Sequence, residues 1–337
     1  MAEIYEIANK MVVKGKGILA ADESSGTIKK RFDTISVKST ENNRMNYRRI
    51  LFETREAMEN YISGVILFDE TLRQSTENDK KLVDIINEAG SLPGIKVDMG
   101  AKELAMTNGE TVTEGLDGLR ERLNEYSDLG AKFAKWRAVI AISDEIPSTL
   151  CIEANSHALA RYAALCQEAG IVPIIEPEVL MDGSHTIEKC YEVTKKTLEK
   201  VFDDLYKHRV DLKGICLKPN MVIDGKESLR KSSPEEIAQM TINCFKETVP
   251  PEVPGIVFLS GGQSEVEATE NLNAINKIDG TPWNLSFSYG RALQASALKA
   301  WQGKSENENE CSKAFAHRAK MNSLATIGKW SRDKDVQ

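Results

Sequence analysis

The chain has 337 residues, of which 41% are hydrophobic and 28% are charged, and its formal net charge is −7. This composition is typical of a globular protein that is long enough to bury a sizeable core. The acidic balance argues against a general affinity for nucleic acid or acidic membranes, so an anionic ligand would need locally placed cations.

No apolar run approaches the length of a membrane span, and the first residues carry acids without a signal-peptide pattern. We therefore expect a cytoplasmic protein. The six cysteines and four histidines are scattered, without the close spacing of zinc ligands or of a disulfide framework. We predict neither a metal site nor another cofactor.

One pattern recurs eight times: a short apolar run ends in charged or small polar residues, and a helical pattern follows. The runs are residues 17–23, 64–70, 94–98, 133–139, 172–178, 214–220, 255–262 and 284–291. Eight alternating strand–helix units predict an α/β fold, a (β/α)8 TIM barrel. An open doubly wound sheet is the alternative, but no Gly-x-Gly-x-x-Gly follows the first run.

Further patterns define the limits of the barrel. An amphipathic segment at about 2–14 predicts an extra N-terminal helix, and a helical tail is expected at about 308–327. Capping boxes are predicted at Ser233–Glu236 and Ser264–Glu267. Because no linker divides the chain, we expect one domain over residues 1–330 and a short, polar, flexible tail over 331–337.

Catalytic groups of a TIM barrel lie at the C-terminal ends of its strands. Those ends carry Asp22, Lys96, Asp98, Lys135, Arg137, Glu176, Glu178, Lys218 and Arg291. Charges placed late in apolar strands are costly unless they are paired or functional. Structural ion pairs could account for a few of them, but a whole rim of such charges favours a functional site.

Lys218 is the candidate nucleophile. A neutral lysine can attack a ketone to give an imine, which stabilises a neighbouring carbanion. Lys218 follows the apolar residues 215–217, and Lys135, if close, would help it to lose its proton. Glu176 or Glu178 could move the protons of this step. Considered alone, Lys218 is as well explained as a structural lysine in a salt bridge at the rim. The surrounding charged residues favour its role as the nucleophile.

Two glycine-containing runs, 259–263 and 288–291, end the seventh and eighth predicted strands. TIM barrels usually bind phosphate at this position, with backbone amides and a helix N-terminus facing the anion. Either run alone could be only a turn, but their pairing favours a phosphate site to which Arg291 adds a charge.

Together these residues resemble the class I, Schiff-base-forming fructose-bisphosphate aldolases. The matching runs are 17–24, 64–72, 94–98, 107–111, 133–137, 176–178, 217–221, 259–265 and 287–301, within a resemblance that covers about residues 1–330. It implies the reversible cleavage of fructose 1,6-bisphosphate to dihydroxyacetone phosphate and glyceraldehyde 3-phosphate, in glycolysis and gluconeogenesis, by a homotetramer.

The resemblance also implies roles for individual residues. Lys218 would form the imine, and Glu176 would act as its acid and base. Lys135 would assist, Glu178 would tune the neighbouring charges, and Asp22 would steer the substrate hydroxyls and help the carbon–carbon cleavage. The implied substrate-binding residues are Ser260, Gly261, Gly262, Ser288, Gly290 and Arg291 at one phosphate, Ser24, Thr27, Arg31 and Lys96 near the other, and Arg137.

Animal members of that family end in a tyrosine that helps proton exchange at the enamine, whereas the last tyrosine here is Tyr289. We therefore expect Glu176 or a water to exchange this proton, and a weaker preference for the bisphosphate over the monophosphate. Two other interpretations remain. Transaldolase-like chemistry is disfavoured by the two phosphate sites, and a binding or scaffold protein is disfavoured because the rim residues are retained.

Overall fold

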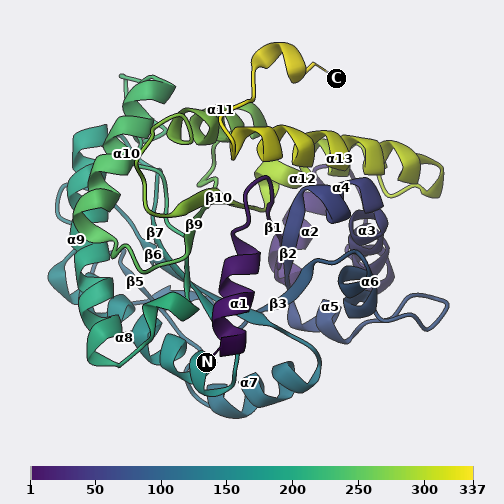
Figure 1. Ribbon diagram of the computed structural model, residues 1–337, viewed down its shortest axis with the longest axis horizontal. Coiled ribbons are helices and arrows are strands. Elements are labelled where there is room, and N and C mark those ends of the chain that lie inside the picture. The colour runs from purple at the N-terminus through teal and green to yellow at the C-terminus, as the bar shows by residue number, and fades with distance from the viewer. Residues whose placement is uncertain (1, 337) are drawn as a thin grey trace.

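The computed structural model describes residues 2–336. Eight parallel strands close into a barrel in the order β1-β10-β9-β8-β7-β6-β3-β2 (Figure 1). Their bounds are β1 (Gly17–Ala21), β2 (Ile62–Leu67), β3 (Leu92–Lys96), β6 (Phe133–Ile140), β7 (Val172–Val179), β8 (Cys216–Leu217), β9 (Gly255–Phe258) and β10 (Asn284–Tyr289). Each overlaps one predicted run, so the TIM barrel is confirmed.

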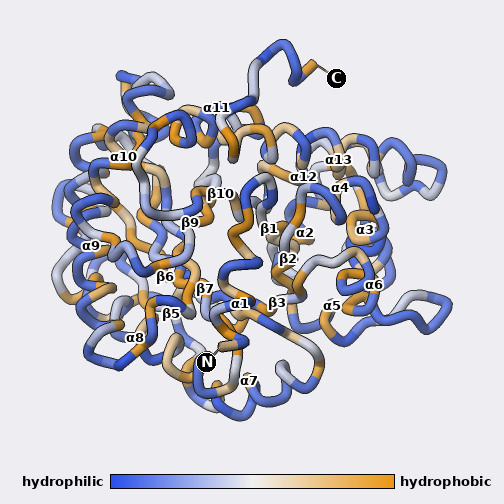
Figure 2. Tube along the Cα trace, viewed as in Figure 1, coloured by the Kyte–Doolittle hydropathy of each residue, from blue (hydrophilic) through white to orange (hydrophobic). Residues whose placement is uncertain are grey.

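Helices surround the barrel and bury their apolar faces against it. They are α2 (Ser25–Asp33), α3 (Glu41–Glu53), α4 (Arg55–Asn60), α5 (Asp69–Arg73), α6 (Leu82–Glu88), α7 (Leu119–Asp128), α8 (Thr149–Glu168), α9 (Ile187–Lys207), α10 (Pro234–Thr248), α11 (Glu265–Ile275), α12 (Arg291–Trp301) and α13 (Glu308–Ala325). Figure 2 shows hydrophobic segments along the strands and hydrophilic segments along the outer loops. No described helix is both long and apolar enough to span a membrane.

The predicted N-terminal helix is α1 (Ala2–Met11), which lies across the N-terminal mouth of the barrel (Figure 1). Ile4, Ile7 and Met11 join the interior side chains of the strands in one buried cluster. The packing is close: a Cβ added at Gly214 would lie 2.7 Å from Ile4, and one at Gly255 would lie 2.6 Å from Val12. This end of the barrel is therefore sealed by packed side chains.

The helix start signals are largely confirmed. At α11 the Ser264 side chain accepts the Glu267 N–H at 3.3 Å, and the Glu267 carboxylate accepts the Ser264 N–H at 2.9 Å, which completes the capping box. At α10 the Ser233 side chain accepts the Glu236 N–H at 3.2 Å, so the serine half of the predicted box is present. Proline is the first residue of α10, where its missing N–H costs no helical hydrogen bond.

Two features of the fold had no sequence prediction. An antiparallel hairpin of β4 (Ala101–Glu103) and β5 (Thr111–Thr113) follows β3. Three short 3-10 turns also occur, η1 (Leu212–Gly214), η2 (Ser305–Asn307) and η3 (Arg332–Lys334).

The C-terminal segment folds back onto α13 beyond η3. The Asp335 carboxylate, with its side chain 3% exposed, accepts two hydrogen bonds of 2.8 Å from Arg318. It also accepts the Trp330 indole N–H at 3.0 Å and lies 3.1 Å from His317 Nε2. Four donors thus surround one carboxylate; the flexibility predicted for residues 331–337 stays a prediction, and residue 337 lies outside the described residues.

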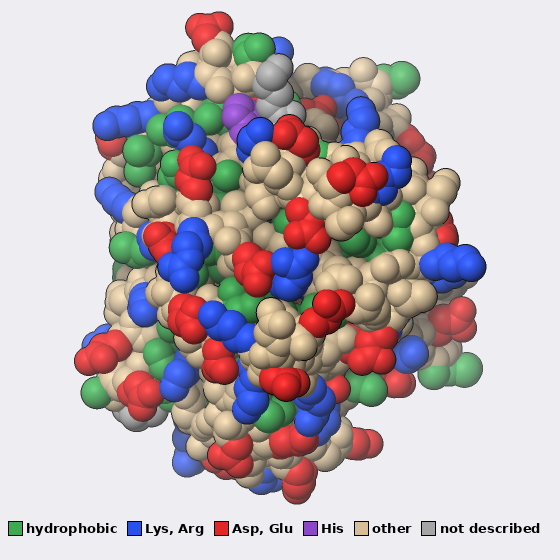
Figure 3. Space-filling model, turned by 90° about the vertical axis from the view of Figure 1, so that its right-hand side faces the viewer, with side chains coloured by type: hydrophobic (Ala, Val, Ile, Leu, Met, Phe, Trp, Pro, Cys, Tyr) green, Lys and Arg blue, Asp and Glu red, His purple; other side chains and the backbone are tan. Residues whose placement is uncertain are grey.

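Acidic and basic side chains are interspersed over the face of the molecule drawn in Figure 3. Several helices also carry exposed ion pairs between residues four apart, for example Lys29–Asp33 at 2.7 Å and Arg55–Glu59 at 2.8 Å.

Candidate active site

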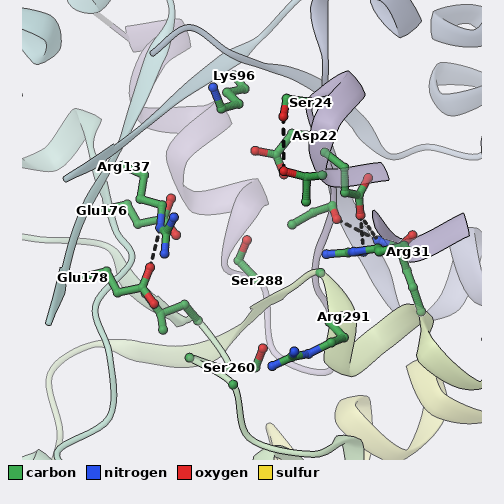
Figure 4. A pocket seen from close by; sticks show the side chains of 18 of the residues that line it. Asp22, Ser24, Arg31, Lys96, Arg137, Glu176, Glu178, Ser260, Ser288 and Arg291 are labelled. Atoms are coloured by element: carbon green, nitrogen blue, oxygen red, sulfur yellow. Dashed lines mark hydrogen bonds and ion pairs between the residues drawn. The ribbon is translucent and has the colours of Figure 1, made fainter. Parts of the chain in front are cut away.

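The C-terminal ends of the barrel strands surround a pocket of about 1080 Å³ (Figure 4). Parallel strands bring these ends to a common rim, so residues far apart in sequence meet there. Every predicted site residue lines the pocket: Asp22, Ser24, Thr27, Arg31, Lys96, Lys135, Arg137, Glu176, Glu178, Lys218, Ser260, Gly261, Gly262, Ser288, Gly290 and Arg291.

Lys218 lies directly after the two-residue strand β8. Its backbone N–H donates to the Ile175 carbonyl of β7 at 2.7 Å, which continues the barrel pairing and fixes the direction of the side chain. The residue is 4% exposed, and its Nζ lies 3.1 Å from Glu176 Oε1. A buried amine therefore faces a buried carboxylate, which can accept or return a proton.

Lys135, on β6, is the second buried ammonium group. Its Nζ lies 3.0 Å from Asp22 Oδ2 and 3.3 Å from Glu176 Oε2. Burial alone would lower the pKa of Lys135, but the carboxylates of Asp22 and Glu176 outweigh burial and hold this pKa well above its ordinary value. Lys135 therefore keeps its proton and is a fixed positive charge in the centre of the pocket.

Asp22 follows β1 and completes the central group. Burial alone would raise the pKa of its carboxyl, but the ammonium groups of Lys135 and Lys218 outweigh that effect and lower the pKa to about 2. Asp22 is therefore ionised at neutral pH. Two carboxylates and two lysines from four strands thus form one buried hydrogen-bonded and ion-paired group.

Further ion pairs support this centre. Arg137 Nε donates to the Glu178 carboxylate, and Figure 4 shows the two side chains together on one wall of the pocket. Lys96 Nζ lies 2.8 Å from Asp98 Oδ1, and Asp98 Oδ2 lies 3.7 Å from Lys135 Nζ. Asp98, for which the sequence predicts no individual role, thus links Lys96 at the rim to Lys135 in the centre.

One end of the pocket is rich in anion-binding groups. Gly261 and Gly262, after β9, have φ angles of +57° and +101°, which an L side chain rarely adopts and which turn the loop into the pocket. Helix α12 begins at Arg291, so its N-terminal amides face the same space. The Ser288 hydroxyl is buried and has no hydrogen-bond partner among residues 2–336. A bound phosphate oxygen would supply one.

The opposite end is built by the start of α2. Ser24 precedes the helix, and its Oγ lies 3.2 Å from Thr27 Oγ1. Arg31, one turn further along, donates to the Glu23 carboxylate. Figure 4 shows Ser24 and Arg31 on one side of the pocket and Ser260 and Arg291 at another edge. These donors form a second group, which meets the first group at Arg31, because a Cβ added at Gly290 would lie 3.3 Å from Arg31 Nη2.

Glu23, Asp182 and Lys226 are further charged residues of the pocket to which the sequence assigned no role. Glu23 directly follows Asp22 in the sequence, and its side chain is directed to Arg31 and Arg48. Asp182 and Lys226 lie in loops without a recognisable motif. Residues 2–336 contain no group of three or more His, Cys, Asp or Glu side chains placed to hold a metal ion.

Comparison with known proteins gives full-length matches. The family described as "Fructose-bisphosphate aldolase class-I" matches residues 3–337. The chain is 58% identical to the cytosolic fructose-bisphosphate aldolase 4 of Arabidopsis thaliana, over 98% of this chain and 85% of that relative. It is 53% identical to fructose-bisphosphate aldolase C of Rattus norvegicus, over 99% of this chain and 92% of that relative.

A solved structure agrees with these matches. The fructose-bisphosphate aldolase of Plasmodium falciparum, described in a ternary co-crystal with TRAP and a small-molecule inhibitor, superimposes with a TM-score of 0.96. It is 49% identical in sequence, and the match covers 98% of this chain and 95% of that one.

Proposed function

The chain belongs to the class I fructose-bisphosphate aldolases, which are glycolytic enzymes, and from this premise we propose that Lys218 carries the reaction as the imine-forming residue. The observation that supports this most is the buried contact of 3.1 Å between Lys218 Nζ and Glu176 Oε1. The contact lies between two groups of phosphate donors. It provides an amine, a proton carrier and room for a doubly phosphorylated sugar in one place.

Imine formation begins when neutral Lys218 Nζ attacks the C2 carbonyl carbon of fructose 1,6-bisphosphate. A carbinolamine forms, and its hydroxyl leaves as water once a proton is supplied. Glu176 is within reach of the same nitrogen, so it takes the proton from the amine and gives one to the departing hydroxyl. Lys135 stays charged beside Glu176 and stabilises its carboxylate form between the two transfers.

Carbon–carbon cleavage then uses the protonated imine. Ionised Asp22 accepts the proton of the C4 hydroxyl, and the C3–C4 bond breaks. The electron pair of that bond moves into the imine and gives an enamine, while C4 leaves as the aldehyde of glyceraldehyde 3-phosphate. Protonation of the enamine at C3 and hydrolysis of the imine release dihydroxyacetone phosphate and regenerate Lys218. Glu176 or a water supplies the C3 proton.

The two phosphates occupy opposite ends of the pocket in this proposal. In the strand order β8-β9-β10, residues 260–262 follow the strand next to Lys218, and residues 288–291 follow the strand beyond it. In this proposal both groups hold the C1 phosphate. Ser24, Thr27, Arg31 and Lys96 hold the C6 phosphate, and Arg137 with Glu178 sets the charge of the wall between them.

We further propose a homotetramer, one domain over residues 1–330 and a cytoplasmic location. Two plant relatives of 58% and 54% identity are named as cytosolic or cytoplasmic, which supports the location. Analytical ultracentrifugation at micromolar protein tests the tetramer: a single species of monomer or dimer mass would exclude it.

Borohydride trapping tests the nucleophile. We expect sodium borohydride with dihydroxyacetone phosphate to inactivate the enzyme and to leave one reduced adduct, which peptide mass spectrometry locates on Lys218. The variant Lys218→Met should give neither adduct nor cleavage, because methionine keeps the side-chain length but removes the amine. An adduct on Lys135 or Lys96 would show that the assignment is wrong.

Two controls separate the proposal from its alternatives. Cleavage of fructose 1,6-bisphosphate without an added acceptor aldehyde distinguishes an aldolase from transaldolase-like chemistry. Activity should also survive incubation with a chelator, because the imine rather than a metal ion stabilises the carbanion in this mechanism. Circular dichroism of Lys218→Met confirms that the loss of activity is not a loss of fold.

A further inference from the structure

Lys226 lies in the loop between β8 and α10, and its ammonium group rests against the proposed C1-phosphate loop. A Cβ added at Gly262 would lie 2.7 Å from Lys226 Nζ and 3.4 Å from Arg291 Nη2. The two cationic groups therefore flank the same glycine, and both line the pocket. Figure 4 shows Arg291 beside Ser260 at this edge of the pocket.

The backbone of Lys226 is held firmly in this position. Its N–H donates to the Met181 carbonyl at 2.7 Å, and the neighbouring Gly225 and Glu227 N–H groups donate to His185 and Gly183 at 2.9 Å each. The approach is so close that a Cβ on Gly225 would lie 2.2 Å from the Gly183 carbonyl oxygen. The loops after β7 and β8 are thus joined by a row of hydrogen bonds.

A buried carboxylate fixes the other side of the same loop. Asp224 is 2% exposed and accepts the Ile187 N–H at 3.1 Å and the Ser232 N–H at 2.7 Å. Lys231 Nζ donates to the carbonyls of Gly225 and Lys226 at 2.8 Å each. Lys226 therefore projects from a rigid segment, although no secondary structure contains it.

The side chain of Lys226, in contrast, is held only weakly. Its Nζ pairs with Asp182 Oδ1 at 2.8 Å, and the two side chains are 41% and 62% exposed. Such exposed pairs contribute little stability, since water screens them. A phosphate dianion in the adjacent loop offers more charge and more acceptor oxygens than one carboxylate, so the ammonium can exchange partners at small cost.

We infer that Lys226 is a further ligand of the C1 phosphate, released from Asp182 when the substrate binds. This inference rests on the proposed function of the pocket. The ketose bisphosphate, the ketose 1-phosphate and dihydroxyacetone phosphate all carry that phosphate. Lys226 thus contributes to the affinity for all three, and Asp182 competes for the same ammonium group.

Steady-state kinetics of Lys226→Met test the inference. The methionine keeps the stem length and removes the charge. We expect KM to rise by roughly five- to tenfold for fructose 1,6-bisphosphate and for fructose 1-phosphate alike, with a much smaller change in kcat. The concentration of dihydroxyacetone phosphate needed for half-maximal borohydride trapping should rise by a similar factor. Lys226→Arg should restore most of the affinity.

Asp182→Asn separates a phosphate ligand from a structural ion pair. If Lys226 binds phosphate, removal of its competing carboxylate should lower KM or leave it unchanged. If the pair only holds the loops together, Asp182→Asn and Lys226→Met should raise KM alike, and the inference would be overturned. Lys189→Met is the matched control. Lys189 also forms an exposed ion pair, with Glu192 at 3.4 Å, but it does not line the pocket.

The experiments distinguish a failure of this inference from a failure of the proposed function on which it rests. If the parent enzyme is trapped by dihydroxyacetone phosphate but Lys226→Met keeps the parent KM within twofold, Lys226 is not a ligand and the proposed function stands. If the parent enzyme gives no adduct on Lys218, the premise fails and this inference falls with it.

Discussion

Glu176 is the residue on which the centre of the pocket depends, because each of its two oxygens faces a different ammonium group. Oε1 lies 3.1 Å from Lys218, and Oε2 lies 3.3 Å from Lys135. In the proposed mechanism Lys218 must lose its proton to react, whereas Lys135 keeps its proton. This arrangement lets one carboxylate exchange protons with Lys218 while Lys135 keeps it from becoming an isolated buried charge.

Glu23 is a positioning residue for Arg31 at the other end of the pocket. Its side chain is 3% exposed and pairs with Arg31 and with the buried Arg48, while Gln294 Nε2 donates to it at 2.9 Å. We expect Glu23→Gln to raise KM for fructose 1,6-bisphosphate roughly fivefold, because Arg31 loses the charge that orients it toward the C6 phosphate. KM for fructose 1-phosphate, which lacks that phosphate, should change less than twofold.

Glu70→Gln is the control for this prediction. Glu70 pairs with Arg44 and lies 3.9 Å from Arg48, so its removal perturbs the same arginine network without touching Arg31. Equal effects of Glu23→Gln on both substrates, or the same effect from Glu70→Gln, would show that the network acts through general stability rather than through Arg31.

Single residues could be predicted from sequence where chemistry and position coincide. Lys135 and Glu176 lie within apolar strands and Lys218 directly follows one, and a charge in such a place has few explanations. Glu23, Asp182 and Lys226 could not be predicted in the same way. Glu23 acts through partners on α2 and α3, and the Lys226 pair depends on how two irregular loops meet, which local sequence does not encode.

Among the elements, strand β8 shows how weak a local signal can be. It has only two residues, Cys216 and Leu217, yet it occupies a full place in the barrel between β7 and β9. The sequence run 214–220 predicted it because the apolar run and the helical spacing around it fit the eight-fold pattern. The β4–β5 hairpin escaped prediction because its strands have only three residues each, β4 is exposed, and the one buried residue of β5 is a threonine, so no apolar face repeats along either strand.

The segment after α13 provides a test at the scale of an element. We expect Asp335→Asn to lower the free energy of unfolding by about 3 kcal/mol, because Arg318, only 4% exposed, would keep its charge without a carboxylate partner. Residues 329–336 should also become more accessible to carboxypeptidase. Chemical denaturation and timed digestion measure the two effects.

Asp333→Asn serves as the comparison for this segment. Asp333 is exposed and lies in η3, the 3-10 turn that precedes Asp335, so its substitution should alter neither stability nor digestion. If Asp335→Asn behaved like Asp333→Asn, the contact with Arg318 would not hold the segment in solution.

At the scale of the whole molecule, the closed barrel holds together oppositely charged side chains that come from different strands. Asp22 follows β1, Lys135 lies on β6, Glu176 on β7, and Lys218 follows β8. Their pairing exists only while the barrel is closed. The stability of the barrel should therefore depend on pH through these groups.

The pKa of Asp22 sets the pH range over which the stability of the folded chain should change. Its pKa is about 2 in the folded chain against an ordinary 3.8. Because the folded value is the lower one, the unfolded chain takes up the proton first, and stability present above pH 4 is lost as the pH falls through about 2. The loss should amount to roughly 2 kcal/mol. Urea unfolding at pH 5, 4 and 3 should show the difference between the parent and Asp22→Asn shrinking as the pH falls; a constant difference would contradict this origin.

The seal formed by α1 has a consequence for how the protein is made. Helix α1 and the following Val12 leave the ribosome early, but Gly214 and Gly255, against which Ile4 and Val12 pack, are synthesised more than two hundred residues later. At about 5–20 residues per second, its apolar face waits for tens of seconds without its binding site. This early segment is thus among the last to find its place, and during that interval its apolar face is exposed to water and to other chains.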